Sequence, residues 1–376
     1  MATAHPLQSA LQAAVDDGTF PGAVLAVRLR GAMVFEGAAG LLTQKEPSVP
    51  VSGDTCYDLA SLTKVLATTT ALVLLVQRGL LKLDERIEGI LAELRDHPIG
   101  AATVRHLLTH SSGLPGWRPY YERIASQAAV HPGFLGSAAA RAAVLDYIAA
   151  EELIYERGTR SLYSDLGFML LGWVVERVSG RPLERFCSEE IFVPLGACPL
   201  GYIPHGLAPT STGLCDAVQA IAPTEEDSWR GRILRGEVHD ENAYALGGVA
   251  GHAGLFGTAR AALAVARAWM DGRRKRPGLL SPDVVSVFTS NRQGVPNSSW
   301  ALGWDTPSVR SSSGTRFSPE SFGHLGFSGT SVWIDPMKEL EVVLLSNRVH
   351  PTRRNEQIRL FRPLIHDLIC RELLKS

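Results

Sequence analysis

The hydrophobic residues near the N-terminus form two short runs and then fill one long segment. Residues 23–28 and 32–36 are apolar runs separated by Arg30-Gly31, a pattern typical of a β-hairpin. Residues 58–78 are apolar on almost every side and end before a glycine, which predicts a helix buried all round. This part of the chain therefore predicts a hairpin followed by a core helix.

Short apolar runs return near the C-terminus. Residues 330–334 and 341–346 flank a turn at 335–338 and predict a second hairpin. Residues 1–20 and 355–374 follow a helical pattern instead. We therefore expect an α/β (α+β) fold, in which an antiparallel sheet is flanked by helices and is built from both ends of the chain.

The middle of the chain has a different character. Residues 80–289 show helical periodicity broken by Gly/Pro loops, and a helix is predicted at 166–178. This contrast predicts a discontinuous sheet domain, 1–79 with 290–376, and a mostly helical inserted domain at 80–289. We expect the active site to lie between the two.

Composition excludes several classes of partner. The 376 residues are 45% hydrophobic and carry a formal net charge of −1, so no global field attracts nucleic acid or an anionic membrane. The most apolar segment, 65–76, is too short to span a bilayer. No signal peptide is visible, which favours a cytoplasmic location. Five cysteines without a C-x-x-C pair fit reduced thiols.

The tetrad Ser61-Leu62-Thr63-Lys64 is the first candidate for chemistry. Residues three apart share one face of a helix, so an amine at Lys64 could take the proton of the Ser61 hydroxyl. Among six lysines, only Lys64 follows a serine by three positions. To act as a base at neutral pH, its pKa must lie about three units below 10.4, and we expect burial to supply that shift. The alternative is a helix-capping serine and an ordinary lysine.

A second candidate, Tyr163-Ser164-Asp165, precedes the helix predicted at 166–178. The Tyr163 phenol could move protons between a serine and a lysine as part of a coupled set. The alternative is a structural one, in which Ser164 or Asp165 caps the helix and Tyr163 packs beside it.

The third candidate, His324-Leu325-Gly326, is expected to open a strand. Gly326 would allow a substrate to approach the strand edge closely. The backbone N–H of Phe327 would then form an oxyanion hole with that of Ser61. A lone histidine such as His324 is, alternatively, a packed core residue.

In order and spacing these three motifs resemble the serine hydrolases that include class C β-lactamases, DD-peptidases and related esterases. Three further segments, 103–114, 254–259 and 333–336, resemble the same superfamily. The resemblance implies that Ser61 is the nucleophile, Lys64 its activating partner and Tyr163 the group that passes the proton to the leaving group.

The resemblance also implies the rest of the site. His324, Gly326, Phe327 and Asp165 would contact the substrate or the oxyanion, without a metal or organic cofactor. Two residues depart from the β-lactamase pattern: His324 replaces a lysine, and Asp165 replaces an asparagine. Because His324 is not a permanent cation, the resemblance favours hydrolysis of a small ester, amide or peptide through an acyl-enzyme.

Three alternatives stay open. The chain could be a β-lactamase. It could be a muropeptide amidase, because segment 229–257 resembles enzymes that cleave N-acetylmuramic acid from the alanine of its peptide. A reading from another class is a non-catalytic penicillin-binding or sensor protein, which would keep the pocket without turnover.

Overall fold

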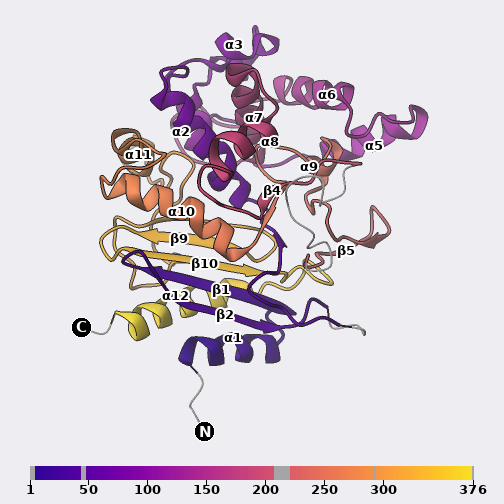
Figure 1. The fold of residues 1–376 in the computed structure, drawn as a ribbon. Helices are drawn as coiled ribbons and strands as arrows, with labels where there is room; N and C mark the ends of the chain where they lie inside the picture. The colour runs from indigo at the N-terminus through magenta and orange to yellow at the C-terminus, as the bar shows by residue number, and fades with distance from the viewer. Residues whose placement is uncertain (1–4, 44–47, 207–220, 291–293, 375–376) are drawn as a thin grey trace.

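The computed structural model describes residues 5–43, 48–206, 221–290 and 294–374 (Figure 1). Two predicted features therefore lie partly outside the described residues: the first four residues of the N-terminal helix and one of the five cysteines, Cys215. Among the helices that the structure describes, none combines the length and apolar character that crossing a bilayer requires.

A five-stranded antiparallel sheet in the order β2-β1-β10-β9-β8 forms one half of the molecule. Its strands are β1 (Gly22–Leu29), β2 (Ala32–Gly40), β8 (Phe322–Leu325), β9 (Ser331–Asp335) and β10 (Leu340–Ser346). Both predicted hairpins are confirmed, and β1 pairs directly with β10 over seven residue pairs, among them Leu25 with Leu344. The two ends of the chain thus meet in the centre of the sheet, as expected.

Helices cover both faces of this sheet (Figure 1). The terminal helices α1 (Pro6–Asp16) and α12 (Ile358–Leu373) pack on one face, and α10 (Ala259–Arg273) packs on the other. Alternate residues of β1 enter the two cores: Leu25 faces α1 and α12, and Val24 faces the opposite core. Period-two alternation within the strand produces this division.

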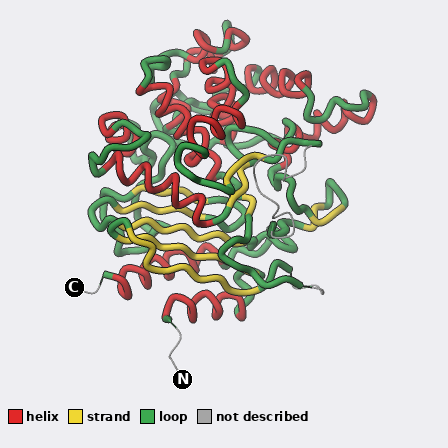
Figure 2. Tube along the Cα trace, viewed as in Figure 1, coloured by secondary structure: helices red, strands yellow, loops and turns green. Residues whose placement is uncertain are grey.

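Most of the remaining helices gather in the other half of the molecule, as Figure 2 shows. They are α2 (Thr70–Gln77), α3 (Ile87–Ile90), α4 (Val104–Leu108), α5 (Tyr120–Val130), α6 (Ala138–Ala149), α7 (Asp165–Ser179), α8 (Leu183–Cys187), α9 (Glu241–Ala245) and α11 (Pro282–Thr289). Short strands accompany them: β3 (Tyr57–Asp58), β4 (Leu200–Tyr202), β5 (Glu226–Asp227), β6 (Arg232–Ile233) and β7 (Leu255–Gly257). The division into two domains stays a prediction, and α10, which falls within the range 80–289, lies on the sheet.

The helix predicted at 58–78 is present, but it begins at Leu62 rather than at Asp58. Asp58 belongs to strand β3, a turn follows, and the stretch Lys64–Thr69 is π-helical before α2 begins. Threonine hydroxyls of this stretch bond to carbonyl groups: the Thr68 hydroxyl donates to the carbonyl of Gly251 at 2.7 Å. The Thr70 hydroxyl donates to the carbonyl of Val65, five residues earlier, at 2.8 Å. Single π-helical turns inside longer helices often occur at functional sites.

Glu341 on β10 gives a test of how burial controls the stability of the sheet. Its side chain is fully buried and lies 3.5 Å from Arg28 and 3.7 Å from Arg267. Burial raises the pKa of Glu341 to about 7, although both arginines oppose the shift. The unfolded chain ionises near pH 4.5, so folding becomes less favourable as the pH rises from 4.5 to 7.

We compare the free energy of unfolding of Glu341→Gln with that of the wild type. We predict that this mutant-minus-wild-type difference is about 2–3 kcal/mol more favourable to the mutant at pH 8 than at pH 5. Urea unfolding at both pH values measures it. Glu339→Gln is the matched control: Arg276 lowers the pKa of the Glu339 carboxyl, so Glu339 is ionised in both states at pH 5 and at pH 8 and its difference should stay nearly constant. A difference for Glu341→Gln that does not change between the two pH values contradicts the prediction.

Candidate active site

The cleft of the protein has two arms, which meet at Ser61. We name the arms after the histidine in each. The His239 arm has a volume of about 380 Å³ and is lined by Ala60, Ser61, Trp117, Tyr163, Asp165, His239, Asp240, Glu241, Ala253, Phe327 and Arg353. The His324 arm has a volume of about 410 Å³ and is lined by Ser61, Tyr163, Trp300, Asp305, His324, Leu325, Gly326, Phe327, Arg348, Ile358, Arg359 and Arg362. Three predicted site residues, Ser61, Tyr163 and Phe327, line both arms.

Ser61 and Lys64 lie within hydrogen-bonding distance. The Lys64 ammonium donates to Ser61 Oγ at 2.9 Å and to the carbonyl of His252 at 3.1 Å. Its Nζ also lies 2.6 Å from Asp165 Oδ1. The Lys64 side chain is fully buried, beneath the floor of the cleft. The spacing of three residues thus brings the amine to the hydroxyl, although through a π-helical turn.

The expected direction of the Lys64 pKa is wrong. Burial by itself lowers the pKa of Lys64, as predicted, but the Asp165 carboxylate and then Tyr163 raise it. Burial is the largest single influence, but Asp165 at 2.6 Å and Tyr163 together outweigh it, so the net pKa of Lys64 lies above its ordinary value. Lys64 is therefore charged in the free protein.

Tyr163 faces both Ser61 and Lys64. Lys64 Nζ lies 4.9 Å from the centroid of the Tyr163 ring, and Tyr163 lines both arms together with Ser61. Burial raises the pKa of the Tyr163 phenol, although the Lys64 charge opposes the shift. The ring packs against His110 and Trp300, with centroids 4.7 and 5.5 Å away. The phenol is thus neutral and is fixed by aromatic packing.

The structural alternative for the second motif applies to only one of its residues. Ser164 caps α7, since its Oγ accepts from the N–H of Gly167 at 3.3 Å. The Ser164 N–H donates to Nδ1 of His110 at 3.1 Å. With the helix end satisfied by Ser164, the side chains of Tyr163 and Asp165 are left to contact Lys64.

Buried Asp58 holds the turn that carries Ser61. One carboxylate oxygen accepts from the N–H of Ala60 at 2.8 Å, and the other accepts from the N–H of His239 at 2.7 Å. Ala60 has a φ of 47°, a left-handed conformation that a non-glycine residue rarely adopts. Asp58 therefore fixes a strained turn and joins it to the wall of the His239 arm.

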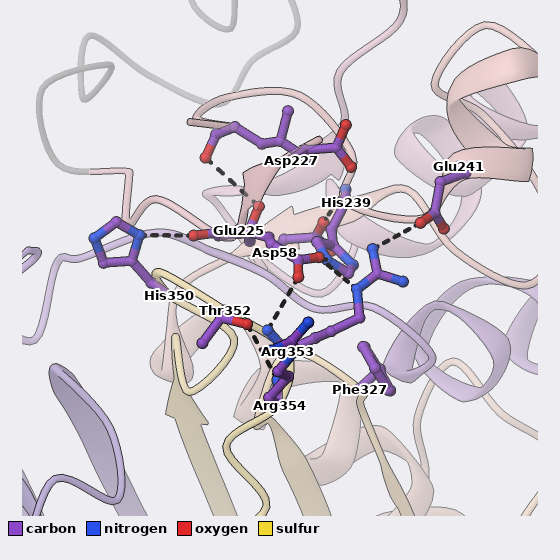
Figure 3. A network of polar contacts seen from close by, with 12 residues as sticks. Asp58, Glu225, Asp227, His239, Glu241, Phe327, His350, Thr352, Arg353 and Arg354 are labelled. Carbon is purple, nitrogen blue, oxygen red and sulfur yellow. Dashed lines mark hydrogen bonds and ion pairs between the residues drawn. The ribbon is translucent and has the colours of Figure 1, made fainter. Parts of the chain in front are cut away.

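Arg353, in the loop after β10, forms ion pairs with two residues of the same wall, as Figure 3 shows. Its guanidinium contacts Glu225 and lies 2.7 Å from Glu241. Glu225 in turn lies 2.9 Å from Nε2 of His239. This network of charged groups orders segment 225–241 beside the nucleophile.

Two residues that line both arms, Ser61 and Phe327, have backbone N–H groups without a hydrogen-bond partner in the described ranges. Within the described part of the chain, no hydrogen bond uses the N–H of Ser61 or of Phe327 as donor. The turn that carries Phe327 leaves no room for a side chain at Gly326, where a Cβ would lie 1.9 Å from Thr330 Oγ1 and 2.6 Å from the carbonyl of Leu59. This arrangement can receive the oxyanion of a tetrahedral intermediate.

His324 is buried and closes strand β8 rather than opening a strand, which corrects the prediction. The chain turns at once after Leu325, and the N–H of Gly326 donates to the carbonyl of Thr330 at 2.7 Å. The strand ends there because this turn returns the chain to β9. Because the strand ends at Leu325, Gly326 and Phe327 lie in the turn and line the same arm as Ser61.

The sequence did not predict a role for several residues that line the cleft, namely Trp300, Asp305, Arg348 and Arg353. It also did not predict a role for Asp58 and His252, which contact the residues of the site from outside the cleft. His252 pairs with Asp240 at 2.9 Å, and both lie in segment 229–257, which the sequence had marked. Arg353 had no local signal, because its role depends on contacts with residues more than one hundred positions away.

Comparison with known proteins places this geometry in context. The family model described as Beta-lactamase matches residues 7–365. The chain is 34% identical over 335 residues to the putative D-alanyl-D-alanine carboxypeptidase of Escherichia coli (strain K12), which covers 83% of this chain and 73% of that protein. It is 32% identical over 357 residues to the N-acetylmuramyl-L-alanine amidase of Bacillus subtilis (strain 168), covering 88% and 78%.

The fold has relatives among solved structures as well. EstCE1, a hydrolase with promiscuous acyltransferase activity, matches with a TM-score of 0.70 at 22% identity, over 95% of this chain and 97% of that one. The predicted fold class and the predicted resemblance are both confirmed. With its sheet, its cleft and a family match over nearly its whole length, this chain belongs to the Beta-lactamase family of hydrolases.

Proposed function

We propose that this protein is a serine hydrolase that forms an acyl-enzyme on Ser61 and acts on a small amide, peptide or ester. One observation carries the proposal: Ser61 Oγ lies 2.9 Å from Lys64 Nζ at the point where both arms of the cleft meet. A hydroxyl, an amine and a phenol in mutual contact can move the protons of acyl transfer.

In the proposed acylation step, Ser61 Oγ attacks the carbonyl carbon of the substrate. The Lys64–Asp165 pair acts as one unit: as the Lys64 proton moves toward Asp165, the amine accepts the proton of Ser61. Tyr163 gives its proton to the leaving nitrogen or oxygen and is reprotonated by Lys64. The C–N or C–O bond breaks, the amine or alcohol leaves, and the acyl group stays on Ser61.

Deacylation reverses this path with water as the nucleophile. Tyr163 and Lys64 take up a proton of the water, and Ser61 recovers its own as the carboxylic acid leaves. During both steps the N–H groups of Ser61 and Phe327 hold the oxyanion. Such a donor is typically worth about 3–4 kcal/mol in the transition state.

Bacterial relatives favour an amide of peptidoglycan fragments as the substrate. They are called a putative D-alanyl-D-alanine carboxypeptidase and an N-acetylmuramyl-L-alanine amidase, and both reactions cleave an amide bond. A non-catalytic sensor is the alternative from another class. It would become labelled at Ser61 without releasing product.

A specific observation favours the amidase as the second candidate. Four aromatic rings are in contact one after another, beginning with Trp117 of the His239 arm: Trp117, Tyr121, Trp229 and Tyr244, with neighbouring centroids 4.7–6.3 Å apart. Trp117 lines the arm and is 42% exposed. The apolar face of a sugar such as N-acetylmuramic acid can pack on rings of this kind.

Ser61→Ala tests the nucleophile. We expect it to abolish labelling by a fluorophosphonate probe and to lower kcat by about a thousandfold or more. The assay panel contains p-nitrophenyl esters, nitrocefin, D-alanyl peptides and N-acetylmuramoyl-L-alanine. Ser126→Ala, an exposed serine on α5, is the matched control. Hydrolysis that survives in Ser61→Ala rules the proposal out, and labelling without turnover in the wild type indicates the sensor.

Asp165→Asn tests the electrostatic partner of Lys64. Without the carboxylate, burial is opposed only by Tyr163, so we expect the pKa of Lys64 to fall below its ordinary value of 10.5. The ¹³Cε resonance of Lys64, assigned by its loss in Lys64→Met, reports the titration. Asp271→Asn, which removes a partner of Arg267, should leave that resonance unchanged. An unchanged titration in Asp165→Asn means that Asp165 does not set the charge of Lys64.

Trp117→Ala tests the aromatic rings of the His239 arm. We expect KM for N-acetylmuramoyl-L-alanine to rise about tenfold, because the sugar loses its packing surface, while KM for a D-alanyl peptide without a sugar stays the same. Steady-state kinetics on both substrates decides between the two candidates. An equal rise for both substrates means that Trp117 does not recognise a sugar.

A further inference from the structure

In the described part of the chain, one ring nitrogen of His324 has a hydrogen-bond partner and the other has none. Its Nδ1 lies 2.8 Å from the carbonyl oxygen of Leu325. A carbonyl oxygen can only accept, so Nδ1 carries the hydrogen and Nε2 of the neutral ring carries a lone pair. Nε2 is buried, and it has no hydrogen-bond partner in the ranges that the structure describes. An acceptor left in this state costs free energy until a donor reaches it.

The surroundings keep the ring neutral. Only 2% of His324 is exposed, and the charges of Lys64 and Arg362 lie close enough to act on it. Burial first, and then the Lys64 charge, lower the pKa of His324 to about 3. Nε2 is therefore an acceptor at any pH at which the protein would work.

The side chain lies where a substrate would be. His324 lines the same arm as Ser61 and Tyr163, and its ring centroid is 5.9 Å from that of Tyr163 and 5.6 Å from that of Trp300. Tyr163 in turn lies beside Lys64, whose Nζ is 4.9 Å from the centroid of the Tyr163 ring. The nearby guanidinium of Arg362 donates to the carbonyls of Gly326 and Thr330 at 2.8 and 2.7 Å. Among the described residues no group donates to Nε2, and a molecule bound in this arm could supply that donor.

We infer that His324 Nε2 accepts a hydrogen bond from the N–H of the scissile amide, which makes this site selective for amides over esters of the same skeleton. The inference deepens the proposed function and rests on it. An amide nitrogen is bonded to the carbon that Ser61 attacks, and it carries one hydrogen. An ester oxygen carries none and would leave Nε2 unpaired. Holding the N–H at His324 would also turn the developing lone pair of the nitrogen toward Tyr163, its proton donor.

The test compares matched substrates that differ only in N–H against O. One pair is acetyl-D-alanyl-D-alanine and acetyl-D-alanyl-D-lactate, and the other is N-acetylmuramoyl-L-alanine and its L-lactate ester. In His324→Phe we expect kcat/KM for the hydrolysed amide to fall at least about tenfold, while the ester changes less than about threefold. His324→Gln retains an acceptor oxygen and should recover part of the amide activity.

His366→Phe is the matched control. His366 on α12 has the same arrangement, with Nδ1 at 2.8 Å from the carbonyl of Ser312 and a buried, unpartnered Nε2, but it does not line the cleft. We expect it to leave the amide-to-ester ratio unchanged. Equal losses on amide and ester in His324→Phe, or no loss on the amide, overturn the inference.

A measurement on the wild type keeps the test decisive if His324→Phe does not fold. For each pair we divide kcat/KM of the ester by kcat/KM of the amide. This ratio should be at least tenfold smaller than the ester-to-amide ratio of the rate constants for alkaline hydrolysis without enzyme. Equal ratios overturn the inference. Labelling of Ser61 separates the two levels. A wild-type protein that is neither labelled nor active refutes the proposed function itself, whereas a labelled, active protein without amide selectivity refutes only the role of His324.

Discussion

The contact between Lys64 and Asp165 is the interaction on which the site depends. A fully buried ammonium is stable only beside an opposite charge, and Asp165 supplies that charge at 2.6 Å. The pair connects the π-helical turn that begins at Lys64 to the first residue of α7, and so brings Ser61 and Tyr163 to the same point. An asparagine at position 165 could accept a hydrogen bond from the amine but could not balance its charge. The departure from the β-lactamase pattern at this position therefore changes the electrostatics of the whole centre.

Contacts between the two halves of the chain hold the rest of the site to this pair. The hydroxyls of Ser328 and Thr330, in the turn between β8 and β9, donate to the carbonyls of Asp58 and Leu59 at 2.7 and 3.0 Å. The turn with Phe327 is thereby fixed to the turn with Ser61, and the two open N–H groups keep their relative positions. Preorganised donors of this kind need no rearrangement when charge develops on a substrate.

The two arms of the cleft differ in their chemistry. One is lined by Trp117 and has a wall ordered by Arg353 and its carboxylate partners, and the other is lined by the imidazole of His324. Because both arms share Ser61 and Phe327, a substrate that fills them places its scissile bond at their junction. This asymmetry suits a molecule whose two halves are unlike, such as an acylated amino acid.

The sequence by itself determined the terminal hairpins, the two terminal helices and the three motifs, because these depend on local periodicity and on short spacings. It also determined that Ser61 and Lys64 could meet. Tertiary structure decided the charge of Lys64, since a pKa depends on the difference between burial and the field of Asp165, which is 101 positions away in the chain. It likewise decided the π-helical turn, the place of His324 at the end of β8, and the roles of Asp58 and Arg353. Each of these depends on a hydrogen bond or ion pair between distant residues, for which periodicity gives no signal.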